Sequence, residues 1–442
     1  MDIAHVIKNN RLLFDAIRRP VLVYGSLKRR LAALEAAPLA QREAFHRRRL
    51  DRVLAAASRM KYGRDRAPEG RDAKRLEAWP ILTKAQVRSD QASFINGRSW
   101  PGSRGQTSGT TGSPMAVHRS LPSLAVEQVA WDMVVEKHGV DPRTMRTAVM
   151  RGDLVKSFDD HEAPFGRVSQ GGRWLVMSSN HLAASTVRAF VEELRAFAPH
   201  CIYAYPSSLH ALCALMELHG LRLDVPLALT SSEVLDESTL RLARRVLGCT
   251  VADYYGQAER VAFAAAHDGA GYRFMPGYAH VELEPAGEKE DGDCYEIIGT
   301  TLWNLRMPLV RYRTGDFIVA PAGLDAAALD ELRFGLRPFL RLLGRQGEFI
   351  AAPDGTHIVG LSRLLYDVEH VYRFQVVQES SSDLLLLLMP MAGFTDRDRE
   401  RVVANAQARI PKSMRVRVEL TDRLERTPAG KTPFVIVRTP AA

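Results

Sequence analysis

Helical segments and short β-rich runs alternate over residues 124–248, and this alternation constrains the fold more than any other feature of the sequence. Apolar side chains recur at helical spacing in residues 125–138, 185–198, 207–219 and 237–246, and short runs such as RTAVMR and LALTSS lie between them. Strands that alternate with helices of this length form α/β domains whose strands are mostly parallel. We therefore expect the chain to fold as an α/β protein.

Two changes in the residue pattern mark further parts of the fold. From residue 272 onward the sequence is β-rich, with turn signals at PAGE, EDGD and RTGD. After residue 345, the stretch VVQESSSDLLLLLMP predicts two strands joined by a polar turn, residues 396–409 predict a helix, and MRVRVEL predicts a strand. A segment with these elements can bury a core of its own. We place an N-terminal domain at residues 1–347 and a small α+β domain at residues 348–442.

The composition excludes several classes of protein. The 442 residues are 46% hydrophobic and 25% charged, and no apolar run reaches the length of about 18 to 20 residues that spans a bilayer. The N-terminus, MDIAHVIKNNRLLFDAIRRP, has charged residues and Asn where a secretory signal has its apolar stretch. Four cysteines are scattered without a CxxC pair, which is typical of a reduced protein with no structural metal. We expect a cytoplasmic protein with no transmembrane segment.

The positive charge of the chain is concentrated near its N-terminus. Residues 1–80 hold 19 Lys and Arg against 9 Asp and Glu, whereas the other 362 residues hold 41 against 42. The stretch LKRRLAALEAAPLAQREAFHRRRLDRVLAAASR has helical periodicity, so we expect a basic helical segment at residues 1–80. A solvated helix face, docking to an acidic partner and contact with anionic lipid are all open for this segment. Nucleic acid is not expected as a partner, because aromatic side chains are sparse among the arginines.

A glycine-rich stretch, SRGQTSGTTGSPMAVH, covers residues 103–118. Glycine lets the backbone approach a ligand closely, and backbone N–H groups and hydroxyls can surround phosphate oxygens. The common phosphate loop GxxxxGK[ST] carries a lysine, whereas here Gly112 is followed by Ser113, Pro114 and Met115. On its own, the stretch fits a phosphate-binding loop and a flexible surface loop equally well.

Two polar clusters further along the chain suit a bound nucleotide. In ADYYGQAER, Tyr254 and Tyr255 precede Glu259. An aromatic ring can stack on a purine, and a carboxylate can hold Mg²⁺ against phosphate oxygens. In LVRYRTGDF, Gly315 makes a tight turn and Asp316 follows it, where a carboxylate can accept both hydroxyls of a ribose. Each cluster alone is also compatible with an ordinary turn.

Two more clusters lie closer to the C-terminus. LLGRQGEF brings Arg345 and Glu348 to the point where the main body gives way to the tail. RTPAGKTP places Lys431 on a Pro-flanked loop, from which a lysine can be carried into a site as a mobile cation. The order of the clusters is informative, because the hydroxyl-rich loop, YGxxE, YRTGD, GRxxE and PxGK follow one another from residue 107 to residue 431.

This series of motifs strongly resembles that of the adenylate-forming enzymes, across essentially the whole chain. The stretches WPILTKAQVR, YAYPSSLHAL, TSSEVL and NLRMPLVRYRTGD make the sequence similar to the branch of phenylacetate-CoA ligases and CapK-like proteins. The resemblance implies a large N-terminal adenylate-forming domain and a small, mobile C-terminal lid domain. It also implies that ATP and a carboxylic acid form an acyl-adenylate with the help of Mg²⁺, and that the acyl group then passes to a thiol such as CoA.

The resemblance implies roles for individual residues. Lys431 and Glu259 would be catalytic, because the lysine and a Mg²⁺ ion bound by Glu259 stabilise the charge that grows as pyrophosphate leaves. Glu348 takes the hinge position, where the family usually has Asp. Ala258 replaces a hydroxyl residue often found before the glutamate, which removes one donor to the α-phosphate. The residues implied to bind ATP are Thr107, Ser108, Gly109, Thr110, Thr111, Gly112, Ser232, Glu233, Tyr255, Gly256, Gln257, Asp316 and Arg345.

The acid and the acceptor stay open at this point. Trp131, Tyr205, Ser207 and Tyr254 are candidates for contacting an aromatic or other apolar acid, although aromatic side chains also pack in cores. CoA is the acceptor that the resemblance favours, and an acidic acyl carrier protein would suit the basic segment. Transfer to an amine or hydroxyl, adenylyl transfer to a cofactor hydroxyl, and a non-catalytic nucleotide-binding protein are the other hypotheses.

Overall fold

The computed structural model divides into two compact units, each built from two segments of the chain. Unit 1 comprises Met1–Thr144 and Ala252–Leu342, and unit 2 comprises Met145–Val251 and Leu343–Ala442. The structure describes residues 11–97, 102–106, 115–153, 155–156, 160, 162–345, 350–351, 353, 357–358, 361–365, 368, 370–408, 410–426 and 433–438.

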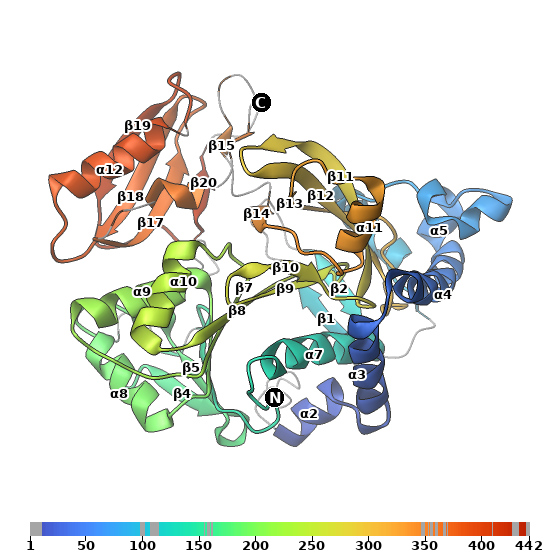
Figure 1. The fold of residues 1–442 in the computed structure, drawn as a ribbon, viewed down its shortest axis with the longest axis horizontal. Coiled ribbons are helices and arrows are strands. Elements are labelled where there is room, and N and C mark those ends of the chain that lie inside the picture. Colours follow the sequence, from blue (N-terminus) through green and yellow to red (C-terminus); the bar gives the residue numbers. More distant parts are fainter. Residues whose placement is uncertain are drawn as a thin grey trace. The chain divides into compact units, whose positions relative to one another are not determined.

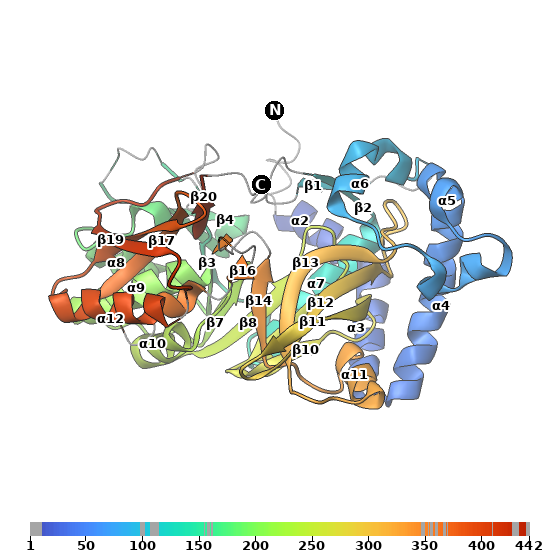
Figure 2. The same cartoon turned by 90° about the horizontal axis from the view of Figure 1, so that it is seen from above.

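Helices make up most of the N-terminal part of unit 1. They are α2 (Arg11–Arg18), α3 (Val21–Ala36), α4 (Leu39–Ser58), α5 (Lys61–Arg66), α6 (Lys84–Ser89) and α7 (Leu121–Glu136). Pro20 and Pro38 directly precede α3 and α4, because proline has no N–H to lose at a helix start and its φ already suits the helix. The two basic helices α3 and α4 lie side by side (Figure 2).

Strands form the rest of unit 1. β1 (Ser103–Gln106) pairs antiparallel with β2 (Ala116–Arg119), with Gln106 opposite Ala116. β8 (Thr250–Gly256) enters unit 1 and pairs antiparallel with β9 (Phe263–His267), which pairs antiparallel with β10 (Ala270–Phe274). The β-rich pattern after residue 272 becomes a four-stranded sheet in the order β11 (Ala279–Lys289), β12 (Gly292–Thr301), β13 (Tyr312–Ala320) and β14 (Arg341–Arg345), with α11 (Ala326–Arg333) inserted before β14.

A mainly parallel sheet is the framework of unit 2 (Figure 1). Its strands lie in the order β7 (Leu227–Ser231), β6 (Cys201–Ala204), β3 (Thr147–Met150), β5 (Trp174–Met177) and β4 (Gly166–Ser169), and β4 runs antiparallel to β5. Every residue of β3 and β7 is buried, as expected for parallel strands covered on both faces. The helices α8 (Val187–Phe197), α9 (Pro206–Leu218) and α10 (Glu237–Leu247) start and end within two residues of the predicted segments.

The C-terminal part of unit 2 has a sheet and a core of its own. Its strands lie in the order β19 (Arg415–Leu420), β18 (Asp383–Pro390), β17 (Val371–Gln378) and β20 (Val435–Val437), and a two-stranded pair, β15 (Ile350–Ala351) with β16 (His357–Ile358), precedes them. Helix α12 (Asp396–Gln407) covers the larger sheet (Figure 2), with Val402 and Ala406 in a common core with Leu386. The predicted strand pair, helix and strand are confirmed. The predicted boundary between residues 347 and 348 stays a prediction, because residues 346–349 lie outside the described set.

The expected α/β class is therefore confirmed, with a parallel sheet, a β-rich part and a small C-terminal α+β part. In the part of the chain that the structure describes, no helix combines the length and the apolar composition needed to cross a bilayer. All four cysteines are buried free thiols.

Candidate active site

Tyr255 joins two strands of unit 1 through its hydroxyl. It lies near the end of β8, and its hydroxyl donates to Oδ2 of Asp316 on β13 over 2.6 Å. The side-chain amide of Gln257 donates to the same hydroxyl, while its Oε1 accepts from the N–H of Ala262 over 3.2 Å. Asp316 is only 4% exposed. The structure thus brings together three residues that the resemblance implies to bind ATP.

The tight turn predicted at Gly315 is wrong, because Tyr312–Ala320 form the continuous strand β13 and Gly315 lies where the pairing with β12 shifts register. Gly315 has φ 72°, a left-handed conformation that costs glycine nothing because it lacks a Cβ. The hydroxyl of Thr314 accepts from the N–H of Asp316 over 3.0 Å and donates to the carbonyl of Ile297 on β12 over 2.7 Å. These bonds fix the direction in which the Asp316 carboxylate leaves the sheet.

Glu259 has one paired and one unpaired carboxylate oxygen. The hydroxyl of Tyr312 donates to Oε1 over 2.9 Å, whereas Oε2 is buried and accepts no hydrogen bond from any described residue. The residue is 3% exposed, and a buried acceptor without a partner costs about 1–3 kcal/mol. Mg²⁺ in nucleotide sites uses one or two carboxylates and takes its remaining ligands from phosphates and water. The orphaned oxygen fits that use of Glu259. Within the described ranges, no group of three or more His, Cys, Asp or Glu could hold a metal by protein ligands alone.

Arg119 connects the β1–β2 hairpin to the backbone beside Glu259. Its Nε and Nη2 donate to the carbonyl of Ala258 over 3.1 and 2.9 Å. The guanidinium lies across Gly105 on β1, where a Cβ would come within 2.6 Å of it. Burial and the nearby Arg260 lower the pKa of Arg119 to about 10, so the side chain keeps its charge at neutral pH. The strands that flank residues 107–114 are therefore anchored next to Glu259.

Arg151 organises the carboxyl edge of the parallel sheet in unit 2, and the sequence analysis missed it. It directly follows β3, and its Nη1 and Nη2 donate to the hydroxyls of Ser231 and Ser232 over 2.6 and 2.9 Å. Its guanidinium carbon lies 4.3 Å from the ring centre of Tyr203 and 4.7 Å from that of Tyr205. Ligands of α/β sheets bind outside this edge. A charged residue directly after the buried run TAVM was the signal that could have identified it.

Glu233 and Ser207, which were assigned to different ligands, are bonded to each other. Oε2 of Glu233 accepts from the backbone N–H of Ser207 over 2.9 Å, at the start of α9. A carboxylate stabilises a helix N-terminus, where N–H groups have no partner within the helix. The preceding Ser232 has φ 71°, a left-handed conformation that is uncommon for a residue with a side chain.

The positions of the other predicted residues add less to the description of the site. Tyr254 stacks on Phe263 with ring centres 5.3 Å apart, Trp131 is half-buried on α7, and Gly256 ends β8. The backbone of Arg345 belongs to β14. Outside the described residues lie Thr107, Ser108, Gly109, Thr110, Thr111, Gly112, Glu348 and Lys431.

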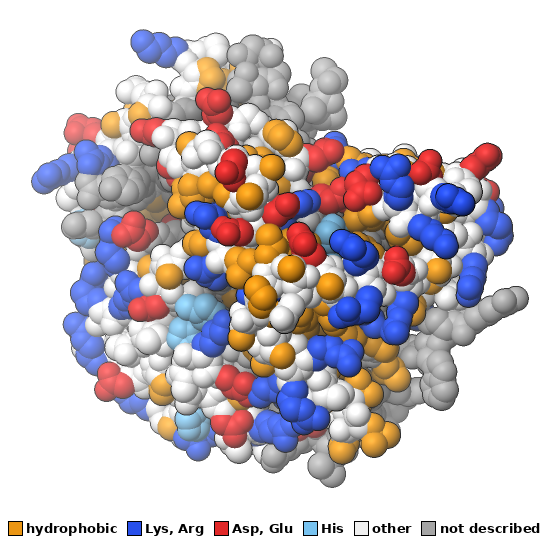
Figure 3. All heavy atoms as spheres, turned by 45° about the vertical axis from the view of Figure 1, so that its right-hand side comes forward, with side chains coloured by type: hydrophobic (Ala, Val, Ile, Leu, Met, Phe, Trp, Pro, Cys, Tyr) orange, Lys and Arg blue, Asp and Glu red, His pale blue; other side chains and the backbone are white. Residues whose placement is uncertain are grey.

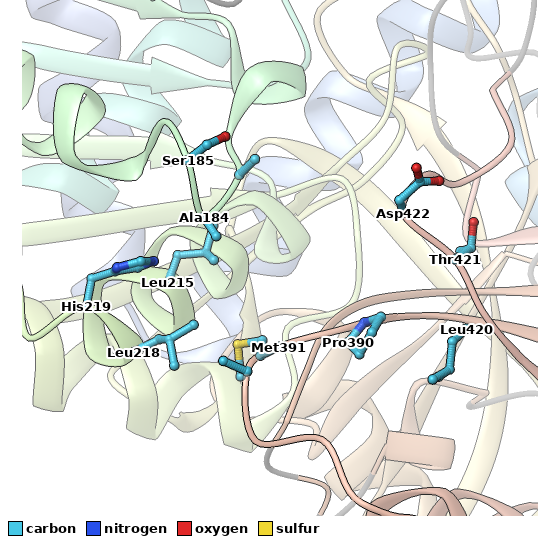
Figure 4. Close-up of a pocket in the computed structure, with 12 residues that line it drawn as sticks. Ala184, Ser185, Leu215, Leu218, His219, Pro390, Met391, Leu420, Thr421 and Asp422 are labelled. Atoms are coloured by element: carbon cyan, nitrogen blue, oxygen red, sulfur yellow. The ribbon is translucent and has the colours of Figure 1, made fainter.

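An apolar pocket of about 800 Å³ in unit 2 does not coincide with any of these residues (Figure 4). Leu215, Leu218 and His219 of α9 and its C-cap line one side, and Met391 and Leu420 line the other. No residue of its lining was predicted to bind ATP or the acid. Each unit therefore has one polar cluster of candidate site residues, around Tyr255 in unit 1 and around Arg151 in unit 2.

Comparisons with known proteins agree with the motifs. Residues 106–317 match the family described as AMP-binding enzyme, and residues 350–438 match the CapK C-terminal domain. The chain is 20% identical to Protein CapK of Staphylococcus aureus over 366 residues. This match covers 81% of this chain and 79% of that protein. Its fold is similar to two crystal structures of 2-hydroxyisobutyryl-CoA ligase in the postadenylation state, one with R3-HIB-AMP and one with 2-HIB-AMP. The TM-scores are 0.62 and 0.61, each at 17% identity with 90% of both chains covered. Residues 106–317 are therefore an AMP-binding enzyme domain, and residues 350–438 are a CapK C-terminal domain.

Proposed function

We propose that this protein is an ATP-dependent, AMP-forming ligase that activates a carboxylic acid as an acyl-adenylate and transfers the acyl group to a thiol. The observation that carries the proposal is the buried, unpartnered Oε2 of Glu259 in the same unit as the Tyr255–Asp316 pair. A buried carboxylate oxygen without a partner is costly, so its retention suits a ligand that is bound only during function.

In the first half-reaction, an oxygen of the substrate carboxylate forms a bond to the α-phosphorus of ATP. The bond from that phosphorus to the bridging oxygen breaks, and pyrophosphate leaves with the electron pair. Mg²⁺, when bound, would neutralise charge on the phosphates, and Glu259 would supply its carboxylate ligand. Lys431 is proposed to stabilise the same charge, and the hydroxyls and N–H groups of residues 107–112 to hold the pyrophosphate.

The Tyr255–Asp316 hydrogen bond supports different proposed roles for the two residues in binding the nucleotide. Because the Tyr255 hydroxyl is already committed to Asp316, the aromatic ring is the part of Tyr255 that is proposed to stack on adenine. A carboxylate that accepts one bond from a phenol keeps further acceptor capacity, which suits Asp316 for the ribose hydroxyls. Arg345 is proposed to reach the same sugar, and Ser232 and Glu233 stay proposed nucleotide ligands.

For the acid, we propose an aromatic or other apolar carboxylic acid as the first class to test, with Trp131, Tyr205, Ser207 and Tyr254 as proposed contacts. Tyr205 supports this choice because it is a half-buried aromatic at the carboxyl edge of the sheet. For the acceptor, we propose CoA as the first thiol to test. A carrier protein is the second candidate, favoured by the basic helices α3 and α4.

The test is ATP–pyrophosphate exchange with a panel of aromatic, aliphatic and hydroxy acids and no acceptor present. We expect exchange with one class of acid, because the acyl-adenylate stays bound while pyrophosphate leaves and labelled pyrophosphate binds and reacts back to ATP. The Lys431→Ala variant should lose exchange far more than acyl transfer from a supplied acyl-adenylate. Absence of exchange with every acid, in protein whose Tm rises with ATP and Mg²⁺, would contradict the proposed reaction.

A further inference from the structure

Helices α3 and α4 form a groove with four arginines above an apolar floor. The groove has a volume of about 470 Å³ and contains no acidic side chain in its lining. Figure 3 shows Lys and Arg side chains gathered on the face that includes these helices, with apolar side chains between them. The residues that line it are Arg30, Ala33, Leu34, Ala37, Gln41, Ala44, Phe45, Arg48, Arg49 and Arg52.

The groove is held in shape by two arginines whose side chains are already bonded. Arg42 is buried and donates to the backbone carbonyls of Glu35, Ala37 and Phe334 over 2.6, 2.9 and 2.7 Å. These bonds fix the connection between α3 and α4. Arg49 donates to the carbonyl of Leu302 over 2.6 and 3.1 Å and lies 3.9 Å from the ring centre of Trp303. A partner would therefore meet a preformed groove.

The other three arginines of the lining carry uncompensated charge. Arg30, Arg48 and Arg52 form no hydrogen bond or ion pair with any residue that the structure describes. Residues 21–58 contain eight Lys and Arg against three Asp and Glu. Burial, with Arg52 and Arg30 nearby, lowers the pKa of Arg49 to about 10, the direction expected where like charges gather. Negative charge brought to this groove would relieve their mutual repulsion.

We propose that this groove docks an acidic amphipathic helix of a partner protein. The floor includes Ala33, Ala37 and Ala44, and such small side chains let the backbone of an added helix approach closely. Arg48 and Arg52 are four residues apart on α4, the spacing that matches acidic side chains at i and i+4 on a facing helix. We assign this partner as the protein that carries the thiol that accepts the acyl group. This part of the inference rests on the proposed function.

The groove favours a helix over the two other anionic occupants of a basic surface. A lipid surface is flat and would leave the concave apolar floor uncovered, whereas a helix can place apolar side chains on it. A free phosphate would engage the arginines but leave the floor exposed to water. Both occupants are included as outcomes of the experiment.

The first experiment measures binding of a fluorescent synthetic helical peptide with Glu at i and i+4 and Leu and Ala on the same face. We expect the Kd to rise about tenfold or more in the double variant Arg48→Glu/Arg52→Glu, because two attractive contacts become repulsive. The matched control is Arg47→Glu/Arg59→Glu, which makes the same change in charge at exposed positions outside the lining. Its Kd should change less than about threefold. A peptide with Lys in place of Glu should bind the first variant better than it binds the parent protein.

Three results would overturn the docking proposal. One is equal binding of a scrambled peptide of the same composition, and another is equal weakening by both double variants, since either indicates non-specific attraction. The third is displacement of the peptide by phosphatidylglycerol vesicles or by inorganic pyrophosphate at a concentration below the Kd of the peptide. That result would assign the groove to a lipid surface or to a phosphate.

A second measurement separates the partner's identity from the proposed function. With a purified acidic acyl carrier protein as acceptor, Arg48→Glu/Arg52→Glu should raise the KM for the carrier about tenfold and leave the KM for CoA unchanged. An equal rise for CoA would refute the carrier assignment. Exchange of ATP with pyrophosphate needs no acceptor, so its absence in the parent protein would refute the proposed ligase while the peptide result stands by itself.

Discussion

Glu259→Gln should make the protein more stable and less active at the same time. The substitution keeps the shape of the side chain and the oxygen that accepts from Tyr312, but it removes a negative charge from a position that is 3% exposed. An unpaired neutral amide is cheaper to bury than an unpaired carboxylate oxygen. We expect the free energy of unfolding without ligands to rise by about 1–2 kcal/mol.

The matched control is Glu282→Gln in the same unit. Glu282 has both carboxylate oxygens within 3.0 and 3.1 Å of Nε of Arg311. Breaking a paired, largely buried glutamate leaves an arginine uncompensated, so this variant should lose about 1–3 kcal/mol. The expected changes in the free energy of unfolding have opposite signs for the two variants. This difference would distinguish a carboxylate that binds a ligand from one that stabilises the fold.

Urea unfolding and ATP–pyrophosphate exchange are the two assays. Saturation with Mg²⁺ and ATP at about 100 times Kd should stabilise the parent protein by about 2.7 kcal/mol, and Glu259→Gln should lose most of the part that depends on Mg²⁺. Exchange should fall about 100- to 1,000-fold, the size found for loss of one preorganised electrostatic group. A variant that is less stable than the parent by more than about 1 kcal/mol, with exchange within about threefold, would refute this reasoning.

Three further perturbations test other parts of the structure. Tyr255→Phe removes the hydroxyl that donates to Asp316, so the KM for ATP in exchange should rise about five- to tenfold with a smaller change in kcat; an unchanged KM would argue against a nucleotide role. Arg151→Lys cannot bond the Ser231 and Ser232 hydroxyls as a fork or lie as a plane on Tyr205, so the KM for ATP, through Ser232, and the KM for the acid, through Tyr205, should both rise about five- to tenfold; two unchanged KM values would argue against a role of Arg151 in the site. Burial lowers the pKa of His280 to about 4 and that of His46 well below its ordinary value. The unfolded chain therefore takes up protons first as the pH falls, and stability should drop between about pH 6.5 and 4 by up to about 1.4 kcal/mol per pH unit for each histidine. Urea unfolding at several pH values would show this slope, and replacing both histidines by Gln should reduce it, leaving the contribution of His267, whose pKa burial also lowers to about 4.

The helices and strands of unit 2 were predictable because their signals are local. The apolar spacing of residues 207–219 predicts α9 to within a residue at each end, and the run DLLLLLMP is too short for a typical helix and becomes β18. Binary patterns of this kind report which side chains a segment must bury. They need no knowledge of which other segment covers it.

The pairings within the candidate site were not predictable in the same way. Tyr255 and Asp316 are 61 residues apart, and Tyr312 and Glu259 are 53 apart. The motif series predicted that Tyr255, Glu259 and Asp316 serve the same site. No spacing in the chain shows that the hydroxyl of Tyr255 bonds to Asp316. Arg151 could not be predicted, because a single arginine after a strand has no periodicity. Its contacts form only because β3, β6 and β7 are neighbours in the sheet.

The bond from Arg119 to the Ala258 carbonyl has a consequence for how ligands influence one another. A ligand held between β1 and β2 that shifts Arg119 also shifts the peptide next to Glu259. Binding at the hairpin and binding at the carboxylate are then linked, and thermodynamic reciprocity requires each to change the affinity of the other by the same factor. If residues 107–112 hold phosphate and Glu259 holds Mg²⁺ as proposed, a substitution that changes the affinity for one would also change the affinity for the other.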